Sequence, residues 1–327
     1  MQPLLEVENL TVRFRIMGLV RQLLVATSRP WVEAVASVSF NLAPASTLAL
    51  VGESGSGKTT LGRALIGLVQ PSGGRVRFEG ADLPDRSAVA WKRWRRQMAM
   101  MFQDPVGSLS PRLTVRALIA EPLAIHGAGP QDLGAEARRL LGLVGLPADI
   151  GGRFPHELSG GQARRVGVAR ALSLNPRLVI ADEPTAGLDV SVQGEVLNLM
   201  SRLQQELGLA YLLITHNLAM VRHVSDRLAV MYLGRLVETG PTDEIFIRPA
   251  HPYTHALLAA QPQPDPDRRR LTVELTGEVP SLRNRPPACE FHTRCPFAQP
   301  ICREEAPELR DIGPERKARC HFPLASG

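Results

Sequence analysis

The first 288 residues of this 327-residue chain contain no cysteine, and the whole chain has only three lysines and few aromatic residues. No apolar run approaches the ~20 residues that a membrane-spanning helix needs, and the N-terminus lacks the hydrophobic core of a signal peptide. We therefore expect a cytoplasmic protein. Its net charge of +6 comes almost wholly from arginine. Basic and aromatic residues interleave only at 91–96, which we interpret as a solvated helical face rather than a nucleic-acid-binding surface.

The most informative pattern present is Gly-Glu-Ser-Gly-Ser-Gly-Lys-Thr at residues 52–59, which fits the phosphate-loop pattern. The apolar run 47–51 predicts a buried strand before it, and residues 59–66 predict a helix after it. Backbone amides and the helix dipole then form an anion site, to which Lys58 adds a charge for the β and γ phosphates of a nucleotide. Thr59 is placed to ligate Mg²⁺. The predicted nucleotide-binding residues of this stretch are Gly52, Glu53, Ser54, Gly55, Ser56, Gly57, Lys58, Thr59 and Thr60.

A second apolar run, 178–183, ends in two acids and predicts a buried strand that delivers charge at its carboxyl end. Asp182 is expected to hold Mg²⁺ or its water shell. Glu183 is expected to orient and polarise an attacking water, because phosphoryl transfer depends on positioning and charge stabilisation. The alternative is a strand that ends at a solvated acidic turn, and the phosphate loop makes this the weaker interpretation.

Six motifs in order resemble those of an ABC-transporter ATPase over residues 4–260: Walker A at 52–59, Gln103 in Met-Phe-Gln-Asp-Pro, the signature Leu-Ser-Gly-Gly-Gln at 158–162, Walker B at 178–183, Leu188-Asp189 in the D-loop, and His216. Ser159 stands where an N-cap would precede the helix-like stretch 162–172, so its hydroxyl and the amides of Gly160 and Gly161 would face an anion. The resemblance implies that ATP is sandwiched between the Walker A of one subunit and the signature of another. Gln162 is the last of these signature residues. A chain with one copy of each must therefore dimerise.

The resemblance also implies roles for isolated residues. His216 is expected to be the switch histidine, which bonds the γ-phosphate and fixes the water held by Glu183. Gln103 is expected to reach Mg²⁺ or the lytic water and to report the γ-phosphate to a membrane permease held near 103–114. Phe14 aligns with the aromatic residue that stacks on adenine, with Trp31 as an alternative; either could instead be a core residue.

Longer strings resemble the ATPase subunits of oligopeptide, dipeptide and nickel importers, and they lie at 95–105, 108–115, 188–193, 230–235 and 251–254. An insertion at about 15–33 and the sequence Leu61-Gly-Arg63 look more like the second of the two ATPases in such systems. This resemblance implies a paralogous ATPase partner, two membrane permease subunits and, indirectly, an extracytoplasmic solute-binding protein, with the chain on the cytoplasmic face of the membrane. The rival class is a non-transport ABC ATPase that acts on nucleic acid. Import of nickel or another small solute is a further alternative.

Three positions depart from the family pattern. Ala186 stands where the D-loop usually has Ser, Asn217 where Asp usually follows the switch histidine, and Arg164 where Gln is common. None of these changes removes a catalytic group, but they leave open whether both ATP sites of a dimer are equally active.

All four cysteines lie beyond the alternating prolines of 261–267, which predict a semi-rigid linker. Because disulfides are unfavourable in a reducing cytosol, the cluster of Cys289, Cys295, Cys302 and Cys320 indicates soft-metal ligation, with unlinked or disulfide-bonded cysteines as the alternative. Five residues separate the nearest pair, which suits a [4Fe-4S] cluster better than structural zinc. The spacing also resembles the C-terminal region of the peptide-importer ATPases, some of which are known to carry such a cluster. His292 and His321 keep a mixed Cys/His zinc site open.

The expected fold is an α/β nucleotide-binding domain at 1–260, with an antiparallel β-subdomain from the N-terminal strands and a helical insert at about 104–160. A small cysteine-ligated domain is expected at 261–327. The expected function is Mg²⁺-dependent ATP hydrolysis that drives import of a peptide or related solute. The cysteine-bearing tail could instead sense redox state or iron and regulate the ATPase.

Overall fold

The computed structural model describes residues 2–16, 31–84, 87–104, 107–127, 132–261 and 277–324. The chain forms two compact units. The signature unit consists of residues 1–4, 42–47 and 83–214, and the phosphate-loop unit of residues 5–41, 48–82 and 215–327. Nearly all of the proline-rich linker and most of the insertion predicted at 15–33 lie outside the described residues.

The signature unit is built on three parallel strands, in the order β8 (Ala210–Thr215), β7 (Leu178–Asp182) and β6 (Met98–Met101). Every residue of β7 and β8 is buried, as continuous apolar runs in parallel strands lead one to expect. The helices are α3 (Ala88–Gln97), α4 (Val115–His126), α5 (Leu133–Leu143), α6 (Gly160–Leu172) and α7 (Val190–Leu207), with 3₁₀ turns at Ala148–Gly152 and Pro155–Glu157.

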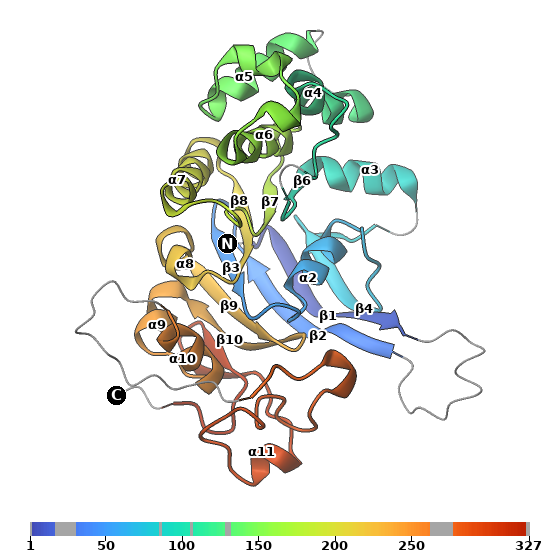
Figure 1. Ribbon diagram of the computed structural model, residues 1–327. Helices are drawn as coiled ribbons and strands as arrows, with labels where there is room; N and C mark the ends of the chain where they lie inside the picture. The colour runs from blue at the N-terminus through green and yellow to red at the C-terminus, as the bar shows by residue number, and fades with distance from the viewer. Residues whose placement is uncertain are drawn as a thin grey trace. The chain divides into compact units, whose positions relative to one another are not determined.

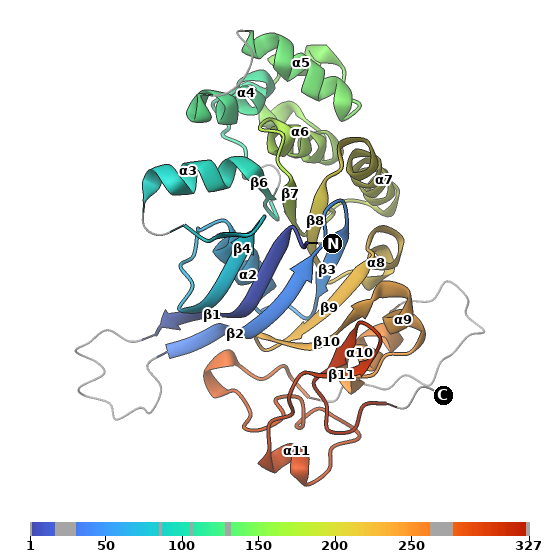
Figure 2. The ribbon, with the colours of Figure 1, turned by 180° about the vertical axis from the view of Figure 1, so that it is seen from behind.

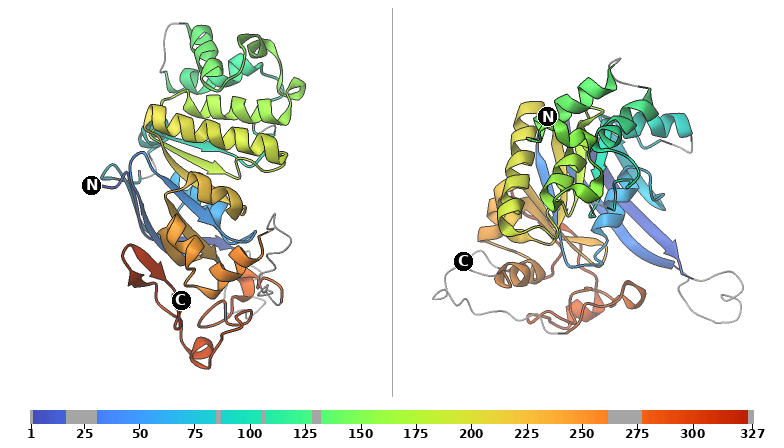
Figure 3. Two further views of the ribbon diagram at one scale, coloured as in Figure 1. Left: turned by 90° about the vertical axis from the view of Figure 1, so that its left-hand side faces the viewer. Right: turned by 45° about the horizontal axis from the view of Figure 1, so that its top comes forward.

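Side-chain caps fix where these helices begin. The residues before α4, α5, α6 and α7 each accept a hydrogen bond from a backbone N–H three residues along, and they are Thr114, Asp132, Ser159 and Asp189. Figure 3 shows α6 and α7 lying side by side. The buried residues of α7 recur at helical spacing, so one face of this helix packs inward.

The phosphate-loop unit contains two sets of paired strands. The first set has the order β2 (Trp31–Leu42), β1 (Leu5–Arg15), β4 (Gly73–Phe78) and β5 (Ala81–Asp82), and Figure 2 shows its long strands side by side. β4 is antiparallel to both of its neighbours, as the predicted β-subdomain requires. The second set has the order β11 (Arg310–Gly313), β12 (Arg316–Ala318), β10 (Arg235–Pro241), β9 (Arg227–Tyr232) and β3 (Thr47–Val51).

In the second set β3 and β9 are parallel, whereas β9 pairs antiparallel with β10. β3 also has the bounds that the sequence predicted for a strand at 47–51. The helices of this unit are α2 (Lys58–Leu65), α8 (Leu218–Val224), α9 (Thr242–Ile247), α10 (Pro252–Ala259) and α11 (Ile301–Glu304), with a 3₁₀ turn at Leu282–Asn284.

The C-terminal segment, defined here as residues 277–324, belongs to the phosphate-loop unit, so the two compact units do not divide at the expected boundary near residue 260. β12 pairs antiparallel with β10, with Glu238 opposite Ala318, and Figure 1 shows the red end of the chain beside β10. The segment also shares a buried apolar cluster with residues of β9 and α10, and this cluster includes Tyr232, Tyr253, Cys289, Phe291 and Cys302. Long-range pairing and burial, which local composition does not encode, place the segment in this unit.

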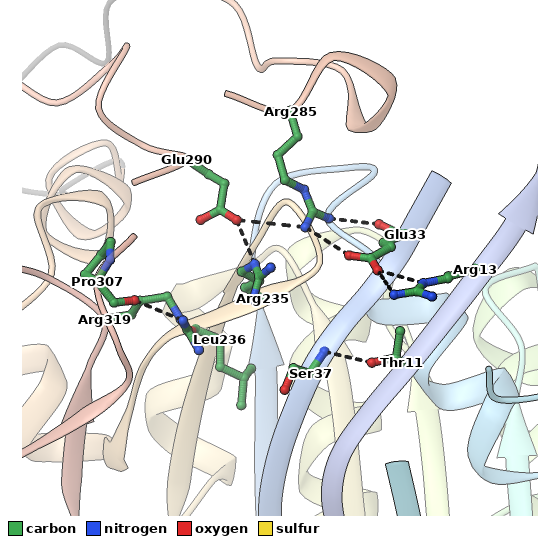
Figure 4. A network of polar contacts seen from close by, with 10 residues as sticks. All are labelled: Thr11, Arg13, Glu33, Ser37, Arg235, Leu236, Arg285, Glu290, Pro307 and Arg319. Carbon is green, nitrogen blue, oxygen red and sulfur yellow. Dashed lines mark hydrogen bonds and ion pairs between the residues drawn. The ribbon is translucent and has the colours of Figure 1, made fainter. Parts of the chain in front are cut away.

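Ion pairs add to this attachment. Glu238 is fully buried, and its Oε1 atom lies 2.9 Å from Nη2 of Arg316. The backbone N–H groups of Ala250 and His251 also donate to this carboxylate, at 2.8 and 2.9 Å. Removing one member of a buried pair usually costs ~3–5 kcal/mol, so loss of either Glu238 or Arg316 would weaken the attachment of the segment. Figure 4 shows a second network, in which Glu33 and Glu290 pair with arginines of the strands and of the segment.

Candidate functional site

The phosphate loop connects β3 to α2 and requires glycine at both ends. Gly52 has a φ of +155° and Gly57 a φ of +102°. A Cβ atom at either position would lie 2.1 Å from a backbone carbonyl oxygen, that of Met231 or of Ala34. Only glycine permits this close approach. The carbonyl oxygen of Ser56 accepts the N–H of Gly234 at 2.9 Å, which fixes the middle of the loop.

Lys58 begins α2 and is 6% exposed. Its ammonium group donates to the carbonyl oxygens of Gly52 and Glu53, at 2.7 and 2.9 Å, and to Oγ of Ser56 at 3.3 Å. Thr59 and Thr60 are half-buried in the first turn of the same helix. The loop therefore brings a lysine side chain and a helix N-terminus together, an arrangement that favours bound phosphate groups.

Two residues from far along the chain contact Glu53 of this loop. The backbone N–H of Glu53 donates to the hydroxyl oxygen of Tyr253 at 2.9 Å. Its carboxylate accepts a hydrogen bond from each terminal nitrogen of Arg294, at 2.8 and 3.0 Å. Sequence reasoning missed both contacts: Tyr253 lies in one of the family-like strings at 251–254, whereas nothing in the local sequence marks Arg294.

A pocket of about 630 Å³ lies beside the phosphate loop. Phe14, on β1, is 44% exposed and lines this pocket together with Ser54 and Gly55. Residues 279–283 of the C-terminal segment line the same pocket. Trp31 lines a different pocket, which contains no residue of the phosphate loop. Of the two aromatic candidates for the nucleotide base, Phe14 is thus the one that shares a pocket with the loop.

The predicted acids lie at the end of a buried strand in the signature unit. Asp182 ends β7 and is 1% exposed, and Glu183 follows at 9%. Glu183 has a φ of +51°, in the left-handed region that costs a non-glycine residue at least ~1 kcal/mol. Its backbone N–H donates to the carbonyl oxygen of Ile214 at 2.8 Å. The adjacent strand β8 therefore helps to hold this strained residue at the carboxyl end of the sheet, where α/β folds bind ligands.

Gln103 follows β6 and is exposed. Its carbonyl oxygen accepts a hydrogen bond from Nη1 of Arg164 at 3.2 Å. Nη2 of Arg164 donates to the carbonyl oxygen of Ala186 at 2.8 Å. Arg164 is 1% exposed, and this burial lowers its pKa. The arginine that replaces the common glutamine therefore connects the Gln103 loop, the D-loop and the signature helix α6.

Ser159 is the N-cap of α6, as the sequence predicted. Its Oγ atom accepts the N–H of Gln162 at 3.2 Å, while Oε1 of Gln162 accepts the N–H of Ser159 at 3.1 Å. This capping box satisfies two backbone donors reciprocally. Ser159 and Gly160 are exposed and Gly161 is half-buried. The N-terminus of this thirteen-residue helix is therefore accessible to an anion.

His216 is an exposed residue in the turn between β8 and α8. The next residue, Asn217, caps α8, because its Oδ1 atom accepts the N–H of Ala219 at 3.2 Å. The N–H of Asn217 donates to Oγ1 of Thr215 at 3.1 Å. Asparagine thus performs the capping that an aspartate would perform here, and this departure leaves the turn that carries His216 intact.

The four cysteines are free thiols. Burial, with a smaller contribution from the charge of neighbouring cysteines, raises the pKa of Cys289, Cys295 and Cys320 to about 11. Within the described ranges, however, no three His, Cys, Asp or Glu side chains are placed to hold one metal ion. The structure therefore does not support the predicted cysteine-ligated domain, and it attaches the segment through ion pairs, strand pairing and apolar packing instead.

Comparison with known proteins covers almost the whole chain. Residues 35–186 match the ABC transporter family, and residues 237–302 match the C-terminal region of the oligopeptide/dipeptide transporter family. The chain is 48% identical to a probable peptide ABC transporter ATP-binding protein of Sinorhizobium fredii, over 97% of this chain and 89% of the relative. It is 47% identical to a putative oligopeptide transport ATP-binding protein of Bacillus subtilis, over 98% of this chain and 95% of the relative. The chain belongs to the ABC transporter ATPases.

Two solved structures confirm the ABC ATPase fold. CbiO1 of Clostridium perfringens, part of an ABC transporter complex, has a TM-score of 0.64 and 28% identity, over 75% of this chain and 91% of that one. The ATP-binding cassette MJ0796, a dimer in a post-hydrolysis state with ADP and phosphate, has a TM-score of 0.64 and 26% identity, over 73% and 98%. This ABC ATPase accordingly binds ATP with Mg²⁺ and hydrolyses ATP. None of the helices in the described part of the chain is long and apolar enough to cross a membrane.

Proposed function

We propose that this ABC ATPase energises a membrane importer for peptides. The observation that carries the proposal is the match of residues 237–302 to the C-terminal region of oligopeptide/dipeptide transporters. The relatives with peptide-transport names cover 97% and 98% of the chain, so the likeness extends beyond the ATPase motifs. The matched region includes β10 and the buried Phe291, which makes it an integral part of the phosphate-loop unit.

The site residues divide the work of ATP hydrolysis. Lys58 and the loop amides bind the phosphates, and the side chain of Phe14 stacks on the base in the adjoining pocket. Thr59, Asp182 and Gln103 would hold Mg²⁺, which when bound offsets the negative charge of the phosphates. Glu183 orients the attacking water, and His216 donates toward the γ-phosphate. The strained backbone of Glu183 supports this role, because strain of this kind concentrates at active sites.

The exposed N-terminus of α6 supports the further proposal that a second subunit completes each ATP site. We assign Ser159, Gly160, Gly161 and Gln162 to the γ-phosphate bound by that subunit. The dimeric MJ0796 structure, with ADP and phosphate, supports a paired arrangement. The second subunit is proposed to be a paralogous ATPase, and the pair to lie on the cytoplasmic face of the membrane with two permease subunits and, indirectly, a solute-binding protein. No nucleic acid takes part in this scheme.

A groove of about 230 Å³ in the signature unit is the proposed permease contact. Its walls come from β6, the residues after Gln103, and α6, and its apolar lining includes Met98, Met100 and Phe102. Arg95, Arg96 and His126 add basic groups to the lining. A short amphipathic permease helix with acidic residues fits this chemistry. Because Phe102 is next to Gln103, a partner seated here is coupled directly to the proposed γ-phosphate sensor.

Filling the groove is expected to release the permease. Gly167 lines the groove on α6, and a Cβ atom added there would meet no heavy atom within 4 Å. Gly167→Phe should abolish co-purification with the permease subunits while ATP binding persists. Gly142→Phe on α5, where a Cβ also meets nothing within 4 Å, is the matched control and should leave co-purification unchanged.

Permease subunits that remain bound to Gly167→Phe would contradict the groove assignment. Failure of the unaltered chain to co-purify with any permease, together with ATPase activity stimulated by DNA, would instead favour the nucleic-acid class. The two outcomes separate an error in the surface from an error in the function.

We also propose that the four cysteine thiols ligate a [4Fe-4S] cluster rather than a zinc ion. All four lie between residues 289 and 320, and Cys289, Cys295 and Cys302 share one apolar cluster, in which the backbone N–H of Cys289 donates to the carbonyl oxygen of Cys302 at 3.1 Å. The five residues between the nearest two cysteines favour a cluster over structural zinc, whose ligands usually come in closer pairs. Anaerobically purified protein should be brown and contain about four iron and four sulfide per chain. Stoichiometric zinc without iron, or metal-free protein, would contradict the cluster.

A further inference from the structure

The carboxylate of Glu53 in the phosphate loop is bound by the C-terminal segment. Arg294 donates from Nη1 and Nη2 to the two carboxylate oxygens, at 2.8 and 3.0 Å, so the contact is bidentate. Arg294 is 5% exposed and the side chain of Glu53 is 24% exposed. Paired, charge-assisted hydrogen bonds of this kind fix orientation as well as distance, and burial of the arginine protects them from solvent screening.

Aromatic side chains hold Arg294 in place. Its guanidinium carbon lies 6.0 Å from the ring centre of Tyr232. Phe291, three residues earlier, has its ring centre 5.4 Å from those of both Tyr232 and Tyr253. The hydroxyl oxygen of Tyr253 accepts the backbone N–H of Glu53 at 2.9 Å. The same packed group therefore contacts both the side chain and the backbone of Glu53.

The position of Glu53 determines the geometry of the rest of the loop. Its carbonyl oxygen accepts the ammonium of Lys58 at 2.9 Å and the backbone N–H of Ser56 at 3.2 Å. Lys58 and the loop amides are the groups that bind phosphate. A displacement of Glu53 would therefore change the position of the lysine and the curvature of the loop together.

We propose that Arg294 is a positioning residue of the nucleotide site, which acts through Glu53 to hold the phosphate loop in its phosphate-binding geometry. The C-terminal segment is then a working part of the ATP site in its own chain. A second observation agrees: residues 279–283 of this segment line the pocket that Phe14, Ser54 and Gly55 also line. Arg294 touches no nucleotide itself, and its contribution is preorganisation of the groups that do.

The test is the affinity for ATP of full-length variants, measured by direct nucleotide titration. Arg294→Met should weaken ATP binding about tenfold, because the coupling energy between contacting residues is typically of the order that changes a dissociation constant tenfold. KM for ATP should rise while kcat at saturating ATP changes little, the pattern of lost uniform binding. Arg294→Lys keeps the charge but not the bidentate geometry, so it should recover part of the affinity and guards against a folding failure of the methionine variant.

Two comparisons separate positioning from general loosening of the segment. Arg319→Met removes contacts with the carbonyl oxygens of Leu236 and Pro307, away from the loop, and should leave ATP affinity unchanged. In a Glu53→Gln background, Arg294→Met should weaken binding little further. Unchanged affinity in folded Arg294→Met protein, an equal loss in Arg319→Met, or full additivity with Glu53→Gln would each overturn the proposal.

Discussion

Glu183→Gln should lower ATP turnover by at least ~10²-fold while the protein still binds ATP. The amide preserves the shape of the side chain but cannot take a proton from water. Glu183 itself is buried at a strand end and has a left-handed backbone. Bound ATP that is not hydrolysed should keep the paired subunits closed. Steady-state phosphate release and size-exclusion chromatography in ATP measure the two effects.

Lys58→Ala is the matched comparison, because it removes a phosphate ligand rather than the group that activates water. It should weaken ATP binding itself, whereas Glu183→Gln should not. A Glu183→Gln protein that releases phosphate at the parental rate would show that another group positions the water.

Ser159→Arg should abolish ATP turnover by the paired subunits although the variant's own phosphate loop still binds nucleotide. The substitution places charge and bulk at the exposed N-terminus of α6, the surface assigned to the partner's γ-phosphate. It also removes the N-cap contact with Gln162, which costs ~1 kcal/mol of stability at most positions. Nucleotide titration and turnover of the assembled pair distinguish the two consequences.

Ser87→Arg controls for the lost cap, because Ser87 caps α3 in the same way and its Oγ atom accepts the N–H of Ala90 at 3.4 Å. It should leave turnover close to that of the unaltered protein. Normal turnover with Ser159→Arg would exclude the signature from the partner's ATP site.

Sequence alone predicts the buried strands of this ABC ATPase well. The run at 47–51 is followed by glycine and the run at 178–183 ends in two acids, so β3 and β7 appear where expected. The N-cap at Ser159 follows from the same kind of local rule, because the capping partner Gln162 is only three residues away.

Contacts between distant residues escape such rules. The proline-rich stretch at 261–267 suggested that a separate domain follows it, yet β12 pairs with β10 and Phe291 packs among aromatic residues of the phosphate-loop unit. An ion pair between residues 78 positions apart, as between Arg316 and Glu238, has no local signature. The contact between Arg294 and Glu53, 241 residues apart, is beyond local prediction for the same reason.

The choice between Phe14 and Trp31 illustrates a further limit. Both are exposed aromatic residues near the ends of neighbouring strands, and residue type does not separate them. Which pocket each one lines depends on where β1, β2 and the phosphate loop lie in the folded unit. The structure places Phe14 in the pocket beside the loop.

The measurement that tests the account most directly is peptide uptake by sealed vesicles that contain the permease subunits, the solute-binding protein, this chain and its paralogue. Uptake should require ATP on the side that carries the ATPases and should cease when this chain carries Glu183→Gln. Vesicles that accumulate peptide equally well without this chain, or with its Glu183→Gln variant, would contradict the conclusion that its ATP hydrolysis drives peptide import.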